Sequence, residues 1–150
     1  MLHFQQADPH TLPMALLLEA DPDPLQVAHY LEGSWGFAAE NEGDVVGVCV
    51  VTPLGEGRAE LMNIAVAPQC QGQGVGSELL AYVIEQVRAR GLATLELGTG
   101  TFGHQLAFYQ RAGFRVTAVV ANHFLDHYPE PIFENGIQHK DMLRLTLALN

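Results

Sequence analysis

Arg58–Val66 is predicted to be a strand, in which successive side chains point to opposite faces. By this alternation Glu60, Met62, Ile64 and Val66 share one face, and Leu61, Asn63 and Ala65 share the other. Apolar residues then recur at helical spacing over Leu79–Val87, and a basic turn and a glycine follow. The pattern predicts a strand that leads through a short loop into an amphipathic helix.

Further strands and helices are predicted on either side of this unit. The turn at residues 41–44 separates two runs rich in β-branched and aromatic residues, which is typical of a hairpin. Pro24 after Asp23 marks the start of the second of two helices in the first third of the chain. The other predicted strands are Leu2–Gln6, Ser34–Glu40, Val45–Pro53, Ala93–Leu97, Phe114–Ala121 and Asp141–Leu149, and another helix is predicted near Gln105–Ala112. This order favours an α/β chain with a mixed sheet and helices on both faces.

The composition favours one intracellular domain. With 150 residues, 48% of them apolar, the chain can form a core without metal or disulfides, and we expect a single domain over residues 1–150. Cys49 and Cys70 provide no disulfide framework, which favours a reducing cytoplasm. No leader or membrane-spanning stretch is recognisable. The net charge of −10, with only 7 Lys and Arg, argues against nucleic acid and favours a cationic partner.

The loop Gln71-Gly72-Gln73-Gly74-Val75-Gly76 stands between the predicted strand and helix, with Ser77 in the first helical turn. Backbone amides at a helix N-terminus are unpaired donors at the positive end of the helix dipole, and glycines leave room for an anion to reach them. The loop lacks the lysine of a P-loop and the glycine spacing of a dinucleotide-binding fold. It therefore predicts a phosphate site of neither type.

Two motifs resemble those of the GNAT N-acetyltransferases. Asn63-Ile64-Ala65-Val66-Ala67-Pro68, followed by Gln71-x-x-Gly74-x-Gly76, resembles the family's acetyl-coenzyme A signature. The segment Ala107–Phe114 resembles its second motif, and together the two cover about half the chain. The resemblance implies the GNAT fold, a central mixed and mostly antiparallel sheet of about seven strands flanked by about four helices.

The resemblance also implies how the cosubstrate acetyl-CoA is held. Its pantetheine arm pairs with the end of the strand, its pyrophosphate lies at the glycine loop, and the Val66 amide is the candidate donor to the thioester oxygen. The family's usual asparagine before the second motif has no clear match in Thr99–Gln105. The residues implied in cofactor binding are Ile64, Ala65, Val66, Gln71, Gly72, Gln73, Gly74, Val75, Gly76 and Ser77.

Three side chains are candidates for the proton transfers. An attacking amine must lose a proton, and Glu60 is the candidate base because related enzymes place a carboxylate on this strand; an ordinary surface glutamate is the alternative. Glu96 is the second candidate, although alternation with Leu95 and Leu97 turns it outward. Tyr109 of the second motif is the candidate acid for the departing thiolate, as in many family members, and a core tyrosine is the alternative.

Aromatic and acidic side chains gather in Phe124–Glu134, which is predicted to be a long loop beside the acceptor cleft. Such a loop suits a cationic amine through charge and cation-π contacts, and a solvated connection is the alternative. His123, His127 and His139 lack partners at zinc-type spacing, so no metal is expected. The candidate acceptor-binding residues are Asp126, Tyr128, Glu130 and Glu134.

Residues 134–142 resemble a bacterial subgroup of the family with poorly defined acceptors, some of them aminoglycoside-acetyltransferase-like. We therefore expect an N-acetyltransferase that moves the acetyl group of acetyl-CoA to a primary amine of a small cationic metabolite or an aminoglycoside-like molecule. A protein or peptide amine is the alternative acceptor, and an inactive acyl-CoA-binding regulatory module is the alternative function. The sequence is compatible with a monomer or a homodimer.

Overall fold

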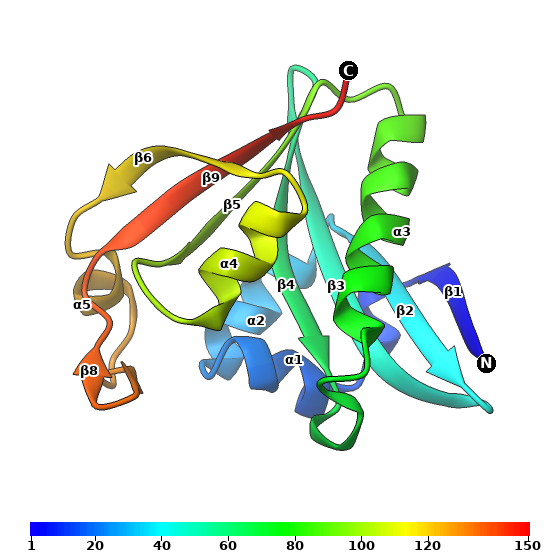
Figure 1. The fold of residues 1–150 in the computed structure, drawn as a ribbon, viewed down its shortest axis with the longest axis horizontal. Helices are drawn as coiled ribbons and strands as arrows, with labels where there is room; N and C mark the ends of the chain where they lie inside the picture. The colour runs from blue at the N-terminus through cyan, green and yellow to red at the C-terminus, as the bar shows by residue number, and fades with distance from the viewer. The chain divides into compact units, whose positions relative to one another are not determined.

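A computed structural model describes residues 1–150 (Figure 1). The helices are η1 (Pro9–Thr11), α1 (Met14–Ala20), α2 (Pro24–Leu31), η2 (Pro68–Cys70), α3 (Val75–Ala89), α4 (His104–Arg111) and α5 (His123–His127), where η denotes a 3-10 helix. The strands are β1 (Leu2–Ala7), β2 (Trp35–Asn41), β3 (Asp44–Gly55), β4 (Arg58–Val66), β5 (Thr94–Gly100), β6 (Arg115–Val120), β7 (Phe133–Glu134), β8 (Ile137–Gln138) and β9 (Met142–Ala148).

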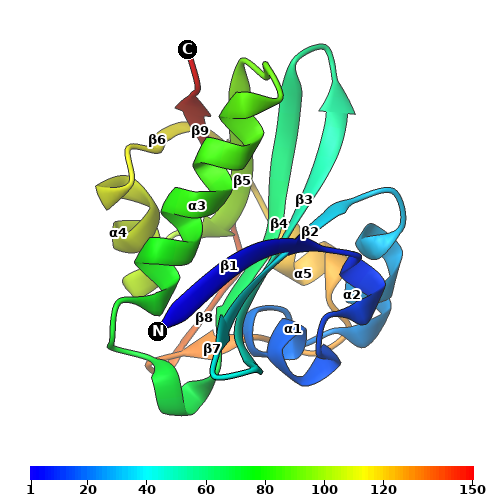
Figure 2. The ribbon, with the colours of Figure 1, turned by 90° about the vertical axis from the view of Figure 1, so that its right-hand side faces the viewer.

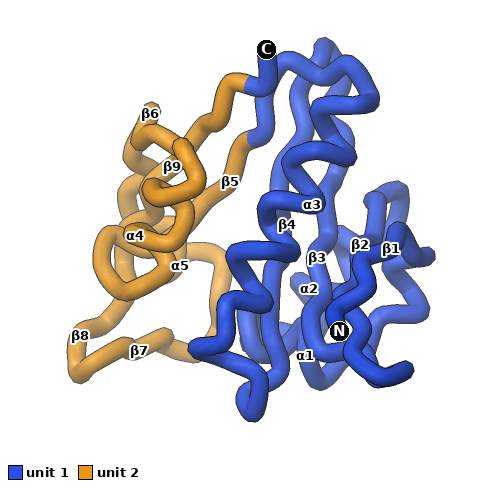
Figure 3. Tube along the Cα trace, turned by 45° about the vertical axis from the view of Figure 1, so that its right-hand side comes forward, with its two compact units in different colours: residues 1–95, 149–150 blue, residues 96–148 orange.

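The chain divides into two compact units, shown in blue and orange in Figure 3. Unit 1 comprises residues 1–95 and 149–150, and unit 2 comprises residues 96–148. Seven strands form one sheet in the order β1-β2-β3-β4-β5-β9-β6, and β7 and β8 form a separate hairpin. The predicted α/β fold with a mixed sheet of about seven strands is confirmed, with five α-helices where about four were expected.

Unit 1 is an antiparallel meander covered on both faces. Strands β1 to β4 pair in sequence order, with α3 on one side and α1 and α2 on the other (Figure 2). The apolar stripe of α3, which includes Leu79 and Val83, is fully buried. Gly47 of β3 permits this close packing, because a Cβ atom there would lie 3.2 Å from a Leu79 methyl carbon. The apolar stripe from which the helix was predicted is therefore the face by which α3 packs against the sheet.

The other predicted elements of unit 1 are confirmed with small shifts at their ends. The hairpin of β2 and β3 turns at Glu42 and Gly43, whose φ angles are 52° and 86°. Helix α2 begins at Pro24, and the Asp23 carboxylate accepts a hydrogen bond from the Leu25 amide at 3.0 Å. Turns and caps are made by neighbouring residues, so the sequence alone is sufficient to predict them.

Unit 2 holds the antiparallel pair β6 and β9, helices α4 and α5, and the β7–β8 hairpin. Strand β5 continues to Gly100, beyond its predicted end at Leu97. Glycines at 98 and 100 weaken the strand signal in the sequence. In the structure Gly98 leaves room for the Met142 side chain, because a Cβ atom there would lie 2.2 Å from the Met142 sulfur and would force that side chain to move. This contact between distant residues is not visible in the local pattern of β5.

The prediction of a long loop over residues 124–134 is wrong. The segment contains most of α5 and all of β7, and an Asn135-Gly136 turn with φ angles of 52° and 78° closes the hairpin. Before α5, the Asn122 amide donates a hydrogen bond to the Asp141 carboxylate at 2.8 Å. Elements this short show no sequence period, although Asn-Gly is itself a hairpin signal.

Candidate active site

The glycine loop leaves the N-terminus of α3 open. Gly72 and Gly74 have φ angles of 79° and 84°, and nothing lies within 4 Å of where their Cβ atoms would stand. Gly74 is the N-cap of α3, and no side chain caps the helix. The amides of Val75, Gly76 and Ser77 therefore keep their hydrogens for an anion, at the positive end of a 15-residue helix. The residues present fit a pyrophosphate group.

The end of β4 directs alternate backbone groups away from β3. Val66 lies opposite Gly47, and the next amide along, that of Ala67, donates to the Val46 carbonyl at 2.8 Å. In an antiparallel ladder this pattern turns the N–H and C=O of Val66 toward the other edge of β4. The Val66 carbonyl accepts a hydrogen bond there from the Gln71 side chain at 3.1 Å.

The same alternation separates the three predicted pantetheine contacts. Ile64 lies opposite Cys49 and repeats the orientation of Val66, whereas Ala65, opposite Val48, directs its backbone groups into the ladder with β3. Ile64 and Val66 therefore turn their backbone groups away from β3, and Ala65 does not. The sequence motif includes all three residues, because the sequence does not show which of their backbone groups hydrogen-bond to β3.

Strand β4 contains a bulge at Met62. Asn63 pairs with Val50, and Leu61 pairs with Val51, so Met62 has no counterpart on β3. A bulge of this kind breaks the period-two alternation, and side chains on its two sides no longer share a face in simple alternate order.

The bulge places Glu60 on the face of β4 that α1 and α2 cover. Its register partner is Thr52, whose hydroxyl lies 2.6 Å from the Ser34 hydroxyl just beyond α2. Met62, two residues along, packs against the core cluster of α1 and α2. The prediction that Glu60 shares the face of Ile64 is therefore wrong. Glu60 is half-buried, so it is not the ordinary surface glutamate that composition allowed.

A buried polar network ties α1 and α2 to β4 on this face. The Asn63 side-chain amide donates to the Leu17 carbonyl and to the Tyr30 hydroxyl, each at 2.9 Å. The Tyr30 hydroxyl in turn donates to the Asp21 carboxylate at 3.3 Å. The side-chain carbonyl oxygen of Asn63 is buried without a hydrogen-bond partner. Sequence reasoning missed this network, and its one signal is an asparagine on the buried side of an alternating strand.

Tyr109 lies on α4, in unit 2, and its residue is only 8% exposed. Its ring meets the Phe108 and Phe114 rings edge to face, with centroid distances of 5.2 and 5.8 Å. Aromatic packing therefore fixes the ring and leaves the hydroxyl as its one polar group.

Glu96, the second candidate base, has an ionic partner. Leu95 and Leu97 on either side are fully buried, as the alternation predicts. The Glu96 side chain is only 15% exposed rather than turned out to solvent, and its Oε1 lies 3.8 Å from Nη2 of Arg144. Glu96 therefore forms an ion pair within unit 2.

The four predicted acceptor-binding residues lie in unit 2 but in different surroundings. Asp126 and Glu130 are exposed, and Tyr128 is half-buried with its ring centroid 5.9 Å from that of Phe124. Glu134 is different, because its Oε1 accepts a hydrogen bond from His139 Nε2 at 2.9 Å. Asp126 and Glu130 are thus open to solvent, whereas Tyr128 and Glu134 each contact another residue of unit 2.

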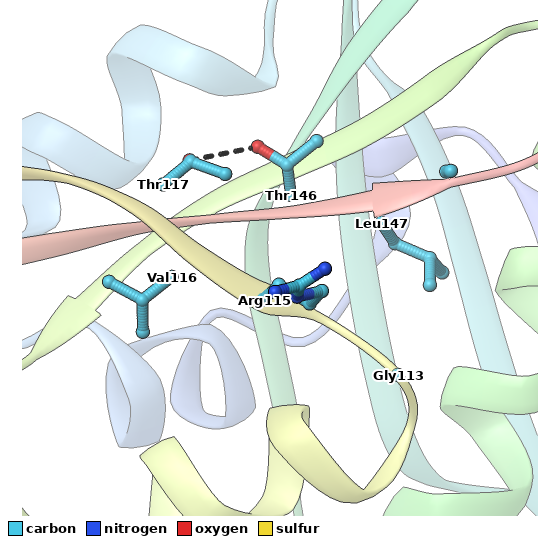
Figure 4. A pocket seen from close by; sticks show the side chains of 7 residues that line it. Gly113, Arg115, Val116, Thr117, Thr146 and Leu147 are labelled. Atoms are coloured by element: carbon cyan, nitrogen blue, oxygen red, sulfur yellow. Dashed lines mark hydrogen bonds between the residues drawn. The ribbon is translucent and has the colours of Figure 1, made fainter.

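Unit 2 contains a pocket of about 440 Å³. It is lined by β6 and β9, where Thr117 and Thr146 hydroxyl oxygens lie 3.1 Å apart (Figure 4). None of the predicted site residues lines it, so it is not the candidate active site. No group of three or more His, Cys, Asp or Glu side chains is placed to hold a metal ion. None of the helices combines the length and apolar character that crossing a bilayer requires.

Comparison with known proteins places these features in one family. Residues 5–114 match the family model described as the acetyltransferase (GNAT) family. The uncharacterized N-acetyltransferase YvbK of Bacillus subtilis is 43% identical over 135 residues, which cover 89% of this chain and 87% of YvbK. Among solved structures, the IAA acetyltransferase from Bacillus cereus is 38% identical with a TM-score of 0.93, covering 99% of both chains. A GNAT acetyltransferase from Elizabethkingia anophelis with acetyl-CoA bound has the same identity and TM-score, covering 98% of this chain and 97% of that one.

The chain belongs to the GNAT acetyltransferase family, and it is an acetyl-CoA-dependent N-acetyltransferase. The motif resemblance drawn from the sequence is thereby confirmed. The open helix N-terminus and the outward backbone groups of β4 are the features of this chain that suit the cosubstrate.

Proposed function

We propose that this enzyme acetylates a primary amine of a small cationic molecule, with Glu60 as general base and Tyr109 as general acid. When bound, acetyl-CoA supplies an activated acetyl thioester. The amine nitrogen forms a bond to the acetyl carbon while the carbon–sulfur bond breaks. The amine proton passes to Glu60, directly or through water, and the Tyr109 hydroxyl gives a proton to the departing sulfur.

The bulge at Met62 is the observation that carries the role of Glu60. Without it, strand alternation would turn the carboxylate to the side of Ile64 and of α3. With it, the carboxylate lies on the opposite face and is half-buried, which separates the proposed base from the cofactor-side residues. The proposal therefore requires the acceptor amine to approach the thioester carbon from the face of β4 that α1 and α2 cover.

The acceptor class rests on charge. A net charge of −10 favours the approach of cations, and exposed Asp126 and Glu130 stand two residues before and two residues after Tyr128 in the chain. A small molecule with several amino groups combines the nucleophile with further positive charges for these carboxylates.

An acceptor panel tests this assignment by release of coenzyme A. We expect turnover of kanamycin or spermidine, with kcat/KM falling as ionic strength rises because the attraction is screened. Turnover only of a peptide with a free amino terminus would replace the small-molecule acceptor by a protein one. Calorimetric binding of acetyl-CoA with no turnover of any amine would instead identify a regulatory module.

Glu60→Gln tests the base. We expect kcat/KM to fall by about 10²-fold, and the rise of the rate with pH that reports ionisation of the base should disappear. Glu42→Gln, at an exposed turn, makes the same change in net charge and should retain the parent profile. A Glu60→Gln enzyme with the parent pH profile would exclude this residue as the base.

Tyr109→Phe tests the acid. The ring packing on Phe108 and Phe114 survives this change, so we expect unchanged acetyl-CoA affinity and a kcat lower by about 10²-fold. Tyr82→Phe is the matched control, because Tyr82 stacks on Phe4 in unit 1 at 5.4 Å and has no proposed role. Parent turnover in Tyr109→Phe would show that this residue is a core tyrosine only.

A further inference from the structure

The loop that leads from β5 into α4 packs closely around the side chain of His139. A Cβ atom on Gly100 would lie 2.3 Å from Cε1 of the His139 ring, so only glycine fits there. The Phe102 ring stacks flat on the imidazole, with centroids 4.1 Å apart and an interplanar angle of 6°. Phe124 of α5 lies 5.5 Å from it by centroids.

The same loop continues onto Glu134 of the β7–β8 hairpin. A Cβ atom on Gly103 would lie 2.5 Å from Oε2 of Glu134, and Gly103 has a φ angle of 106°. The next residue, His104, places its Nδ1 3.7 Å from the same oxygen. From Gly100 to His104 the chain therefore follows the surface formed by Glu134 and His139.

Glu134 and His139 hold each other in one arrangement. His139 Nε2 lies 2.9 Å from Oε1 of Glu134, and the His139 side chain is only 9% exposed. Its Nδ1 is buried without a hydrogen-bond partner, so the bond to Glu134 is the one that fixes the imidazole. Loss of the carboxylate would leave a buried imidazole with neither nitrogen paired, which is costly.

Helix α4 depends on this pair at its N-terminus. Gly103 is the N-cap and makes no side-chain cap, as glycine has none. The Glu134 carboxylate, from another element, lies against Gly103 and brings a negative charge to the positive end of the helix dipole. The N-terminus of α4 is therefore held by contacts within unit 2 between residues that are distant in sequence.

We propose that Glu134 and His139 form a positioning pair that sets the β5–α4 loop and, through α4, the hydroxyl of Tyr109. This inference rests on the proposed role of Tyr109. In this proposal Glu134 is a positioning residue that acts through Tyr109, and it is no longer counted among the acceptor-binding residues. It also explains how this chain orders a loop in which the family's usual asparagine has no clear match.

Hydrogen exchange tests the positioning without any acceptor. In Glu134→Ala we expect amides 101–106 to exchange at least about 10-fold faster than in the parent, with α3 amides unchanged as internal reference. Glu134→Gln retains an acceptor for His139 Nε2 and should recover part of the protection. Gly103→Ala should resemble Glu134→Ala, whereas Gly33→Ala in unit 1, with a φ angle of 77° and open space around it, should not. Parent exchange rates at 101–106 in Glu134→Ala would overturn the proposal.

Kinetics with coenzyme A release test the link to Tyr109. We expect Glu134→Ala to lower kcat by about 5-fold or more with the KM for acetyl-CoA within about 2-fold, and to have little further effect on Tyr109→Phe. Equal losses in both backgrounds would overturn the link. If Tyr109→Phe alone keeps parent turnover, the acid role of the proposed function fails, while the exchange data still decide whether the pair orders the loop.

Discussion

Gly74→Glu is the substitution that bears most directly on the pyrophosphate site. Gly74 has a φ angle of 84°, which costs a residue with a Cβ atom about 1–2 kcal/mol. The space around it is open, so no clash adds to this cost. We expect the melting temperature to fall by about 2–8 °C, with the fold retained.

The effect on binding should be much larger than the effect on stability. A carboxylate about 5 Å from one phosphate charge costs about 3 kcal/mol at an effective dielectric constant of about 20. That energy corresponds to a loss of at least about 100-fold in coenzyme A affinity. Isothermal calorimetry with coenzyme A measures the affinity, and urea unfolding measures the stability of the same sample. Gly74→Ala separates the two effects, because it carries the backbone strain without the charge.

Gly91→Glu is the matched control at the far end of the same helix. Gly91 has a φ angle of 79° and nothing within 4 Å of its Cβ position, so the strain and the charge change are the same. The helix separates the two sites by about 20 Å, well beyond the screening length of about 8–10 Å at physiological salt. We expect parent affinity in Gly91→Glu. Affinity within about 3-fold of the parent in Gly74→Glu, or an equal loss in both variants, would refute the assignment of the loop.

Two further predictions concern the core of unit 1. Asn63→Ala leaves the Leu17 carbonyl and the Tyr30 hydroxyl without their buried donor, so urea unfolding should show a loss of about 2–3 kcal/mol; a loss below about 0.5 kcal/mol would contradict it. Burial raises the pKa of the Cys49 thiol, so a thiol reagent should modify half-buried Cys70 well before Cys49 in the folded protein. The unfolded chain ionises the Cys49 thiol above about pH 8.5 while the folded chain does not, so its contribution to stability is complete below that pH and falls by up to about 1.4 kcal/mol per pH unit above it. Cys49→Ala should abolish that part of the slope, and an unchanged slope would disprove it.

The sequence by itself determined the parts of the molecule that neighbouring residues build. Features that depend on residues within a few positions of one another could be predicted from the sequence. These are the apolar stripe of α3, the glycine loop before it, the β2–β3 turn and the cap at Asp23. The motifs around Val66 and Tyr109 were likewise sufficient to indicate the family, which the comparisons confirm.

Only the tertiary structure decided where the side chains of the site point and what they touch. The bulge at Met62 reverses the face of Glu60, and no pattern within β4 announces it, since it arises from how that strand registers with β3. Glu134 and His139 are five residues apart, yet their bond and the loop wrapped around them depend on a hairpin closing and on β5 arriving beside it. Local propensity acts over a few residues, whereas strand register and buried hydrogen bonds are settled by packing between distant segments. For that reason the sequence was sufficient to predict the chemistry of the family, but it was not sufficient to predict how the candidate catalytic side chains are oriented.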